Sequence, residues 1–219
     1  SIGGRALLEM IYEPELCEQS LTYGMIALKA LHGADLSSPR WRVTGGGLHW
    51  TRGPKLALSE LLSTALLTPS QRKELARLLS GYFWRRSGRT VLVHGDLQAT
   101  HVIVDLPQQT LGIIDLEAVH LGKASMNFAQ LWDGYYLASP RLGCEFYRRY
   151  VAAFPHLIDE HFDTDVRAEL ALRSYSHVKV GRQRGNVEME IRARTLLTQV
   201  LSGMSFAELC QKGASHNLE

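Results

Sequence analysis

Residues 90–117 stand apart from the rest of this chain, because short β-branched and aliphatic runs replace the helical spacing of apolar residues there. The three runs are Thr90-Val91-Leu92-Val93, His101-Val102-Ile103-Val104 and Leu111-Gly112-Ile113-Ile114. Each run has the length of a strand, and the residues between the second and third runs suit a hairpin loop. A strand pattern confined to the middle of a helical chain predicts an α+β fold that is mainly α, with a short central β-hairpin.

Helices are predicted on both sides of this insertion, wherever apolar residues recur three and four positions apart. These segments are 15–32, 55–66, 69–86 and most of 128–219. Residues 5–12 predict a short apolar strand that ends before Pro14. No internal repeat or linker divides the chain, so residues 1–219 are expected to form a single domain.

Charge and composition exclude several classes of protein. The 24 Lys and Arg residues against 22 Asp and Glu residues give a net charge of +2, too balanced to indicate binding to nucleic acid or a membrane surface. No apolar run reaches the roughly 18 residues that a membrane-spanning helix needs. The three cysteines lie far apart and suit a reducing compartment. We therefore expect a cytoplasmic protein without nucleic-acid or membrane partners.

Three polar residues lie at the open end of the predicted hairpin. A turn centred on Gln108 places His101 opposite Asp115, because the two are equally far from it along the chain. Asp96 precedes the same end by one loop. We expect the three side chains to converge where the apolar strands stop, which is a common position for a functional site.

Such a trio supports metal-assisted phosphoryl transfer. A loop carboxylate such as Asp96 can orient a substrate hydroxyl and accept its proton. His101 and Asp115 can hold Mg²⁺ against the phosphates of a nucleotide. Two simpler interpretations stay open at this point: His101 can cap the hairpin, and Asp115 can cap the turn that follows it.

Two sequence motifs resemble those of the aminoglycoside phosphotransferase family, the small-molecule branch of the kinase fold. They are His94-Gly95-Asp96-Leu97 and Gly112-Ile113-Ile114-Asp115. The helix end Ala30-Leu31-His32-Gly33 is also similar to that family, and the resemblance covers most of residues 5–135. It implies the carboxy-terminal lobe of a kinase-like phosphotransferase. The implied parts are a hinge strand over 1–12, helices over 13–89 and 118–219, and the catalytic loop and hairpin over 90–117.

The resemblance also implies a role for each site residue. Asp96 corresponds to the catalytic base, and His101 and Asp115 correspond to the magnesium ligands. A hinge that meets the adenine ring and two residues that orient the catalytic loop complete the implied site. The hinge residues are Glu9, Met10 and Ile11, and the orienting residues are His94 and Asn127.

Three features depart from the family pattern. His101 stands where this fold usually has Asn, and Asn127 stands where the family has a carboxylate that braces the catalytic loop. With a hinge near residue 10, the amino-terminal lobe, which carries a Gly-rich loop and a phosphate-pairing Lys, is absent from this chain. We therefore expect these 219 residues alone to be inactive.

The sequence thus predicts transfer of a γ-phosphoryl group from ATP or GTP, with Mg²⁺ or Mn²⁺, to a hydroxyl of an aminoglycoside-like compound or a metabolite. One alternative is a catalytically incomplete lobe that acts as a binding or partner-dependent module. Another is a metal-dependent hydrolase that uses His94, Asp96, His101 and Asp115. An apolar seam around Leu7, Leu8 and Ile11 also predicts self-association, or docking of a partner lobe, through residues 1–12.

Overall fold

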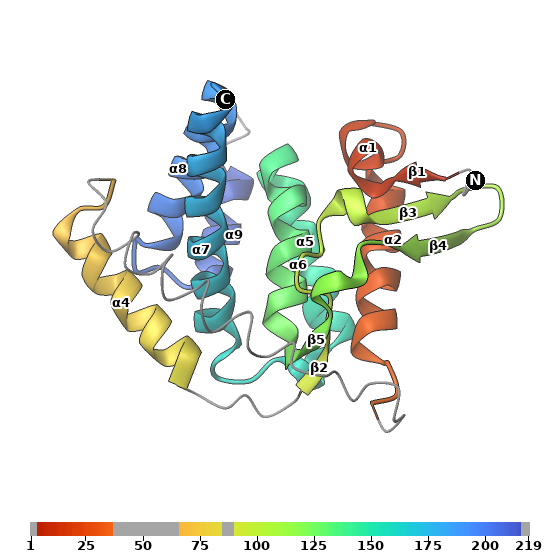
Figure 1. Ribbon diagram of the computed structural model, residues 1–219, viewed down its shortest axis with the longest axis horizontal. Helices are drawn as coiled ribbons and strands as arrows, with labels where there is room; N and C mark the ends of the chain where they lie inside the picture. The colour runs from red at the N-terminus through yellow and green to blue at the C-terminus, as the bar shows by residue number, and fades with distance from the viewer. Residues whose placement is uncertain (1–3, 37–65, 85–89, 216–219) are drawn as a thin grey trace. The chain divides into compact units, whose positions relative to one another are not determined.

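The structure of the protein is a computed structural model that describes residues 4–36, 66–84 and 90–215 (Figure 1). The chain divides into two compact units. The first unit spans residues 1–46 and 89–158, and the second spans 47–88 and 159–219. Each unit buries an apolar core of its own. Within the described residues, no helix combines the length and the apolar character needed to cross a membrane.

The first unit contains two small sheets and several helices. Its strands are β1 (Arg5–Ala6), β2 (Thr90–Val93), β3 (Val102–Asp105), β4 (Thr110–Ile113) and β5 (His120–Lys123). Its α-helices are α1 (Leu7–Tyr12), α2 (Cys17–His32), α5 (Ala124–Ala138) and α6 (Pro140–Ala153). Its short 3₁₀ helices are η3 (Ala99–His101), η4 (Leu116–Ala118) and η5 (Pro155–Leu157). The mainly helical class predicted from the sequence is therefore confirmed.

Both sheets are antiparallel. One has the order β1-β3-β4, and the other pairs β2 with β5. The sequence pattern predicts β2, β3 and β4 but not β5, because His120–Lys123 contains no β-branched residue. The hairpin of β3 and β4 lies beside α2 (Figure 1).

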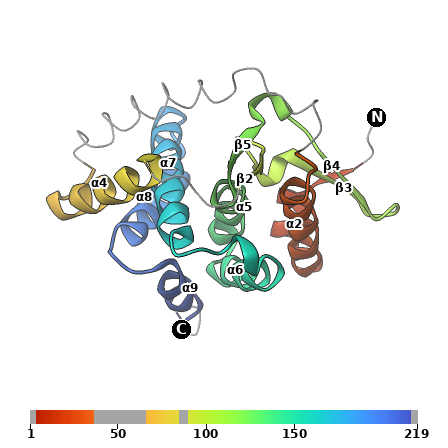
Figure 2. The ribbon, with the colours of Figure 1, turned by 90° about the horizontal axis from the view of Figure 1, so that it is seen from below.

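Helix α5 forms the centre of the first unit. Its side chains Phe128, Trp132 and Tyr135 are fully buried. Phe128 and Tyr135 each stack on Phe146 of α6, and the hydroxyl of Tyr135 donates a hydrogen bond to the carbonyl of Ser20 in α2. Figure 2 shows α2 and α6 beside α5. A helix buried on nearly every side is a rigid platform for the segments that it contacts.

The strand predicted over residues 5–12 is wrong from Leu7 onward. Only Arg5 and Ala6 pair with β3, and Leu7–Tyr12 forms helix α1. Leu7, Met10 and Ile11 have the three-and-four spacing of one helical face, and that face is buried. Leu7 and Ile11 of the expected apolar seam are consequently buried in the unit itself, and Leu8 is half-buried, so these residues do not form an exposed apolar seam.

The hairpin register differs from the predicted one by one residue. Val102 pairs with Ile113, and Asp105 pairs with Thr110. A four-residue loop connects the strands, and Gln109 in this loop has a positive φ of 52°. A turn centred on Gln108 would require an odd number of loop residues, so the predicted pairing of His101 with Asp115 is wrong. The carbonyl of His101 instead accepts a hydrogen bond from the backbone N–H of Ile114.

The second unit is helical in its described part. It contains α4 (Pro69–Trp84), α7 (Phe162–Gln183), α8 (Val187–Val200) and α9 (Phe206–Ser215). Helix α7 packs against the other three. Asn186 caps α8, because its side chain accepts a hydrogen bond from the N–H of Met189. The helix predicted over 55–66 lies, up to residue 65, outside the described residues.

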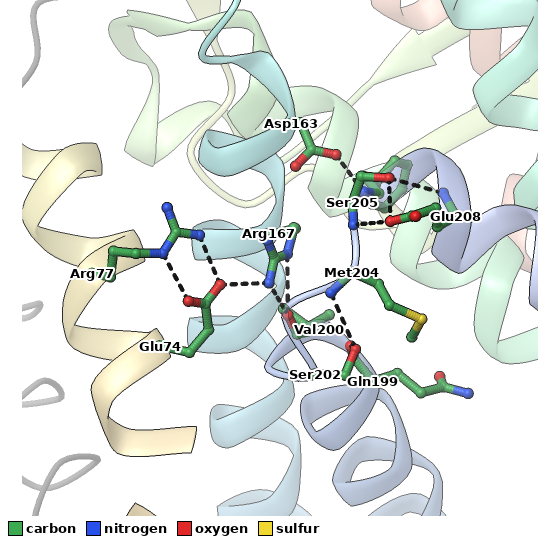
Figure 3. A network of polar contacts seen from close by, with 11 residues as sticks. Glu74, Arg77, Asp163, Arg167, Gln199, Val200, Ser202, Met204, Ser205 and Glu208 are labelled. Atoms are coloured by element: carbon green, nitrogen blue, oxygen red, sulfur yellow. Dashed lines mark hydrogen bonds and ion pairs between the residues drawn. The ribbon is translucent and has the colours of Figure 1, made fainter. Parts of the chain in front are cut away.

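A polar network joins the four helices described in the second unit (Figure 3). Arg167 of α7 is 4% exposed, and it pairs with Glu74 of α4 at 2.7 Å. Its guanidinium also donates to the carbonyl of Val200 at the end of α8. Asp163, one turn earlier on α7, accepts a hydrogen bond from the backbone N–H of Phe206. These contacts tie α4, α8 and α9 to α7.

Candidate active site

His94 connects the loop after β2 to the end of β4. It is fully buried, and its Nδ1 atom accepts a hydrogen bond from the backbone N–H of Asp96 at 3.3 Å. Its Nε2 atom lies 2.8 Å from the carbonyl oxygen of Ile114. Because a carbonyl oxygen only accepts hydrogen bonds, Nε2 carries the proton and His94 is the neutral Nε2–H tautomer. The imidazole therefore holds Asp96 and the residue before Asp115 in a fixed arrangement.

Gly95 allows the close turn between His94 and Asp96. Its φ of +88° lies in a region that residues with a Cβ atom rarely adopt. A Cβ atom at this position would lie 2.5 Å from the carbonyl oxygen of Ala118. The loop thus passes so near η4 that only glycine fits here.

Asp96, His101 and Asp115 form a cluster in which one ligand atom from each lies within 4.8 Å of the others. His101 Nδ1 lies 2.8 Å from the backbone carbonyl oxygen of Asp96, so Nδ1 carries the proton. Nε2 is then the unprotonated nitrogen of a neutral His101, and it lies 3.7 Å from Oδ2 of Asp115. Asp115 itself has a left-handed backbone with φ of 61°, and half of its side chain is exposed.

Gln98 contacts both carboxylate oxygens of Asp96, although the sequence analysis does not single it out. Its side-chain nitrogen donates at 3.0 Å to Oδ1 and at 2.9 Å to Oδ2. The Gln98 amide thereby restrains the orientation of the Asp96 carboxylate. Its only signal in the sequence is its position two residues after Asp96, which is too common a spacing to indicate a contact.

Two side-chain amides of α5 support the same loop. Asn127 Oδ1 accepts a hydrogen bond from the N–H of His94, and its Nδ2 donates to the carbonyl of Leu92. Gln130 accepts from the N–H of Leu97 and donates to the carbonyl of Gly95. The sequence analysis names Asn127 but misses Gln130. The spacing of three residues, which puts both on one face of a helix, is the signal that could have found it.

The expected hinge residues do not form an extended segment. Glu9, Met10 and Ile11 belong to α1, where the carbonyl of Met10 accepts a hydrogen bond from the N–H of Glu13. The side chains of Met10 and Ile11 point into the core, and Glu9 is exposed and lies 3.5 Å from Arg5. A helical segment does not offer the extended strand edge expected of a hinge.

Comparisons with known proteins agree with the two motifs. The model of the phosphotransferase enzyme family matches residues 13–170. The fold is similar to that of aminoglycoside 2'-phosphotransferase-IIIa, solved as its GDP complex, with a TM-score of 0.56 and 20% identity over 92% of this chain and 69% of the other. A comparison with curated proteins finds no match.

Two further solved structures share the fold. Macrolide 2'-phosphotransferase type I has a TM-score of 0.52 and 16% identity, over 90% of this chain and 60% of its own. The ethanolamine kinase of Plasmodium vivax has a TM-score of 0.51 and 17% identity, over 91% of this chain and 63% of its own. At these identities the similarity concerns the arrangement of the backbone.

Proposed function

The chain belongs to the phosphotransferase enzyme family, and we propose that it moves the γ-phosphoryl group of ATP or GTP to a hydroxyl group of a small molecule. The observation that carries this proposal is the cluster of Asp96, His101 and Asp115, whose ligand atoms lie within 4.8 Å of one another. A base and two potential metal ligands in one place are what phosphoryl transfer requires of a protein, since most of the catalysis is positioning and charge stabilisation.

Asp96 is the residue that we assign as the base. It stands in the loop after β2, where Gln98 holds both of its carboxylate oxygens and His94 accepts a hydrogen bond from its backbone N–H. A carboxylate held in this way can accept a hydrogen bond from the acceptor hydroxyl and orient that oxygen. It takes the hydroxyl proton as the oxygen attacks phosphorus.

His101 and Asp115 are the residues that we assign to the metal. The donor set fits a divalent cation, because a neutral His101 keeps its proton on Nδ1 and offers Nε2 as a ligand, and the carboxylate of Asp115 lies 3.7 Å from Nε2. The bond from Nδ1 of His101 to the carbonyl of Asp96 fixes the ring, as an outer hydrogen bond commonly does for a ligating histidine. When bound, Mg²⁺ or Mn²⁺ would neutralise charge on the phosphates.

The acceptor and the nucleotide are assigned only by class. Relatives of the same fold are named for an aminoglycoside, a macrolide and ethanolamine, which supports a small molecule as the acceptor. The aminoglycoside enzyme was solved with GDP, which supports a purine nucleotide as the donor.

We further propose that residues 1–219 correspond to the carboxy-terminal lobe of a kinase-like enzyme. Cys17, Cys144 and Cys210 form no disulfide with one another, which favours the cytoplasm.

The test is a phosphoryl-transfer assay on the full-length gene product, with residues 1–219 alone as the comparison that is expected to be inactive. The assay uses γ-labelled ATP and GTP, Mg²⁺ or Mn²⁺, and a panel of aminoglycosides, macrolides and amino alcohols. Labelled product that forms with the wild-type protein and does not form with Asp96→Asn supports the proposal. Nucleotide and metal binding without transfer to any acceptor would favour a binding module. Metal-dependent hydrolysis of an ester without nucleotide would favour a hydrolase. Either of these results would overturn the proposed transfer.

A further inference from the structure

Helix α5 presents two buried carboxamides to the backbone of the catalytic loop. The Asn127 amide bridges the carbonyl of Leu92 and the N–H of His94, at 2.8 and 3.0 Å. The Gln130 amide bridges the carbonyl of Gly95 and the N–H of Leu97, at 3.0 and 2.6 Å. The first amide therefore brackets Val93, and the second brackets Asp96.

The two bridges have the hydrogen-bond pattern of a parallel β-ladder. In such a ladder one residue donates its N–H to the carbonyl before a residue of the next strand and accepts, at its own carbonyl, from the N–H after that residue. The pairing of β2 with β5 ends at Val93, so the following residues have no strand partner there. Asn127 and Gln130 lie three positions apart on one helical face, and the residues that they bracket are also three positions apart. The side chains of α5 thus give the loop after β2 the hydrogen bonds that a neighbouring strand would otherwise provide.

We infer that Gln130 is a positioning residue for the transfer reaction, because it fixes the backbone on both sides of Asp96 to the most deeply buried helix of the first unit. This inference rests on the function proposed above. Gln130 is 3% exposed and Leu97 is fully buried, so water does not replace these hydrogen bonds. With its backbone fixed, the Asp96 carboxylate moves only through its own two side-chain torsions, and Gln98 restrains these. A base held in this way spends more time in the reactive geometry.

Only an amide can fill this place. It offers one donor and one acceptor at the same end of the side chain, which the carbonyl of Gly95 and the N–H of Leu97 require. Glutamate at position 130 would keep the acceptor but turn an oxygen lone pair toward the Gly95 carbonyl. Methionine would fill the same volume and lose both hydrogen bonds. The two variants therefore separate the acceptor contribution from the donor contribution.

The experiment compares Gln130→Met and Gln130→Glu with Tyr135→Phe. Tyr135 lies on the same helix and donates a buried hydrogen bond to the carbonyl of Ser20, away from the loop. Hydrogen exchange of the Leu97 amide is measured in all three, together with Mn²⁺ binding and the kcat and KM of transfer. Gln130→Met should speed exchange at Leu97 at least about tenfold, the change expected when a buried hydrogen bond is lost. Its kcat should fall about tenfold or more, and its KM for the acceptor should change little.

The control should keep wild-type exchange at Leu97 and wild-type kcat, even where its thermal midpoint falls. Gln130→Glu should keep more of the protection of Leu97 than Gln130→Met, because it keeps the acceptor for that N–H, and should still lower kcat, because it lacks the donor to the Gly95 carbonyl. The inference is overturned if Gln130→Met keeps both the protection of Leu97 and the wild-type kcat, or if Tyr135→Phe lowers both equally. A full-length wild-type protein that transfers no phosphoryl group would refute the proposed function, whereas the exchange of Leu97 would still decide whether Gln130 fixes the loop.

Discussion

The Nε2 atom of His101 lies 3.7 Å from a carboxylate oxygen of Asp115, although the two residues are not partners across the hairpin. His101 is held by the carbonyl of Asp96, and Asp115 reaches it through a left-handed backbone conformation one residue beyond the pair formed by His101 and Ile114. In a neutral His101, the nitrogen that can bind a metal thus faces the carboxylate. Backbone geometry at the end of β4 brings together two groups that strand pairing alone would separate.

Replacing Asp96 by Asn should abolish phosphoryl transfer by the full-length protein and leave the fold intact. The Asn amide keeps the size of the side chain but cannot take a proton. A positioned base typically contributes roughly 10²–10⁴-fold to the rate. The measurement is kcat with circular dichroism as a check of folding. Asp105→Asn, at the hairpin loop and outside the cluster, is the matched control and should retain full activity. A rate above about a tenth of wild type in Asp96→Asn would remove Asp96 from the role of base.

Replacing His101 by Asn should shift metal preference from Mn²⁺ toward Mg²⁺. Imidazole favours Mn²⁺ more than it favours Mg²⁺, which prefers oxygen ligands such as the Asn carbonyl. Titration of both metals by calorimetry gives the ratio of the two dissociation constants. His120→Asn is the control, because His120 hydrogen-bonds the carbonyl of Ala118 and is outside the cluster. An unchanged ratio in His101→Asn would show that His101 does not bind the metal.

Replacing Gly95 by Ala should disrupt the catalytic loop. The positive φ of 88° and the 2.5 Å approach of a Cβ to the carbonyl of Ala118 both oppose a side chain. We expect a loss of about 2 kcal/mol or more in the free energy of unfolding, together with loss of transfer activity. Gly112→Ala is the control, since a Cβ there has no atom within 4 Å. Equal stability of the two variants by urea unfolding would contradict this account of the loop.

Replacing Glu74 by Gln should destabilise the second unit far more than replacing Arg77 by Ala. Glu74 binds both arginines, but Arg167 is 4% exposed whereas the Arg77 side chain is 56% exposed (Figure 3). Removing the carboxylate leaves a buried guanidinium without its counter-charge, which costs about 3 kcal/mol, whereas an exposed ion pair is worth at most about 1 kcal/mol. Urea unfolding monitored by circular dichroism measures both. Similar losses in the two variants would show that burial of Arg167 is not decisive.

His32 should make the protein less stable below neutral pH. Burial, together with the smaller effect of the nearby His156, lowers its pKa to about 4. Its ring packs edge-on against Tyr150 and Phe154, and in the described part of the chain neither ring nitrogen has a hydrogen-bond partner. Between the ordinary histidine pKa of about 6.5 and the folded value, the unfolded chain binds more protons. The free energy of unfolding should therefore fall as the pH falls through this window, by about 3 kcal/mol in total.

The measurement for His32 is the free energy of unfolding in urea at pH values from about 7.5 to about 4, a range that covers the window between the two pKa values. His32→Phe should flatten the dependence, because the titrating group is gone and the ring still fills the space. His156→Gln should keep most of it, because burial is the larger cause of the lowered pKa. A pH dependence in His32→Phe equal to that of wild type would assign the effect to other groups.

Local patterns in the sequence account for much of the fold. Helix α2 and strands β2, β3 and β4 lie close to their predicted bounds, because hydrophobic period and β-branched content act over a few residues. The pattern at residues 7–12 predicts a strand where the structure has a helix, because its three buried apolar residues are spaced as on one face of a helix and are also typical of a short strand. Local patterns also miss β5, whose residues become a strand only by pairing with β2.

By itself, the sequence determined which residues can carry the chemistry. Few residue types accept a proton or bind a metal, and their order around a hairpin restricts the reaction. The tertiary structure decided how these residues meet. The hairpin loop set the register, the backbone of Asp115 brought its carboxylate to His101, and the packing of α5 placed Gln130 beside Asp96. Such contacts depend on where separate segments lie in space, and an amide that braces a backbone leaves no local pattern in the chain.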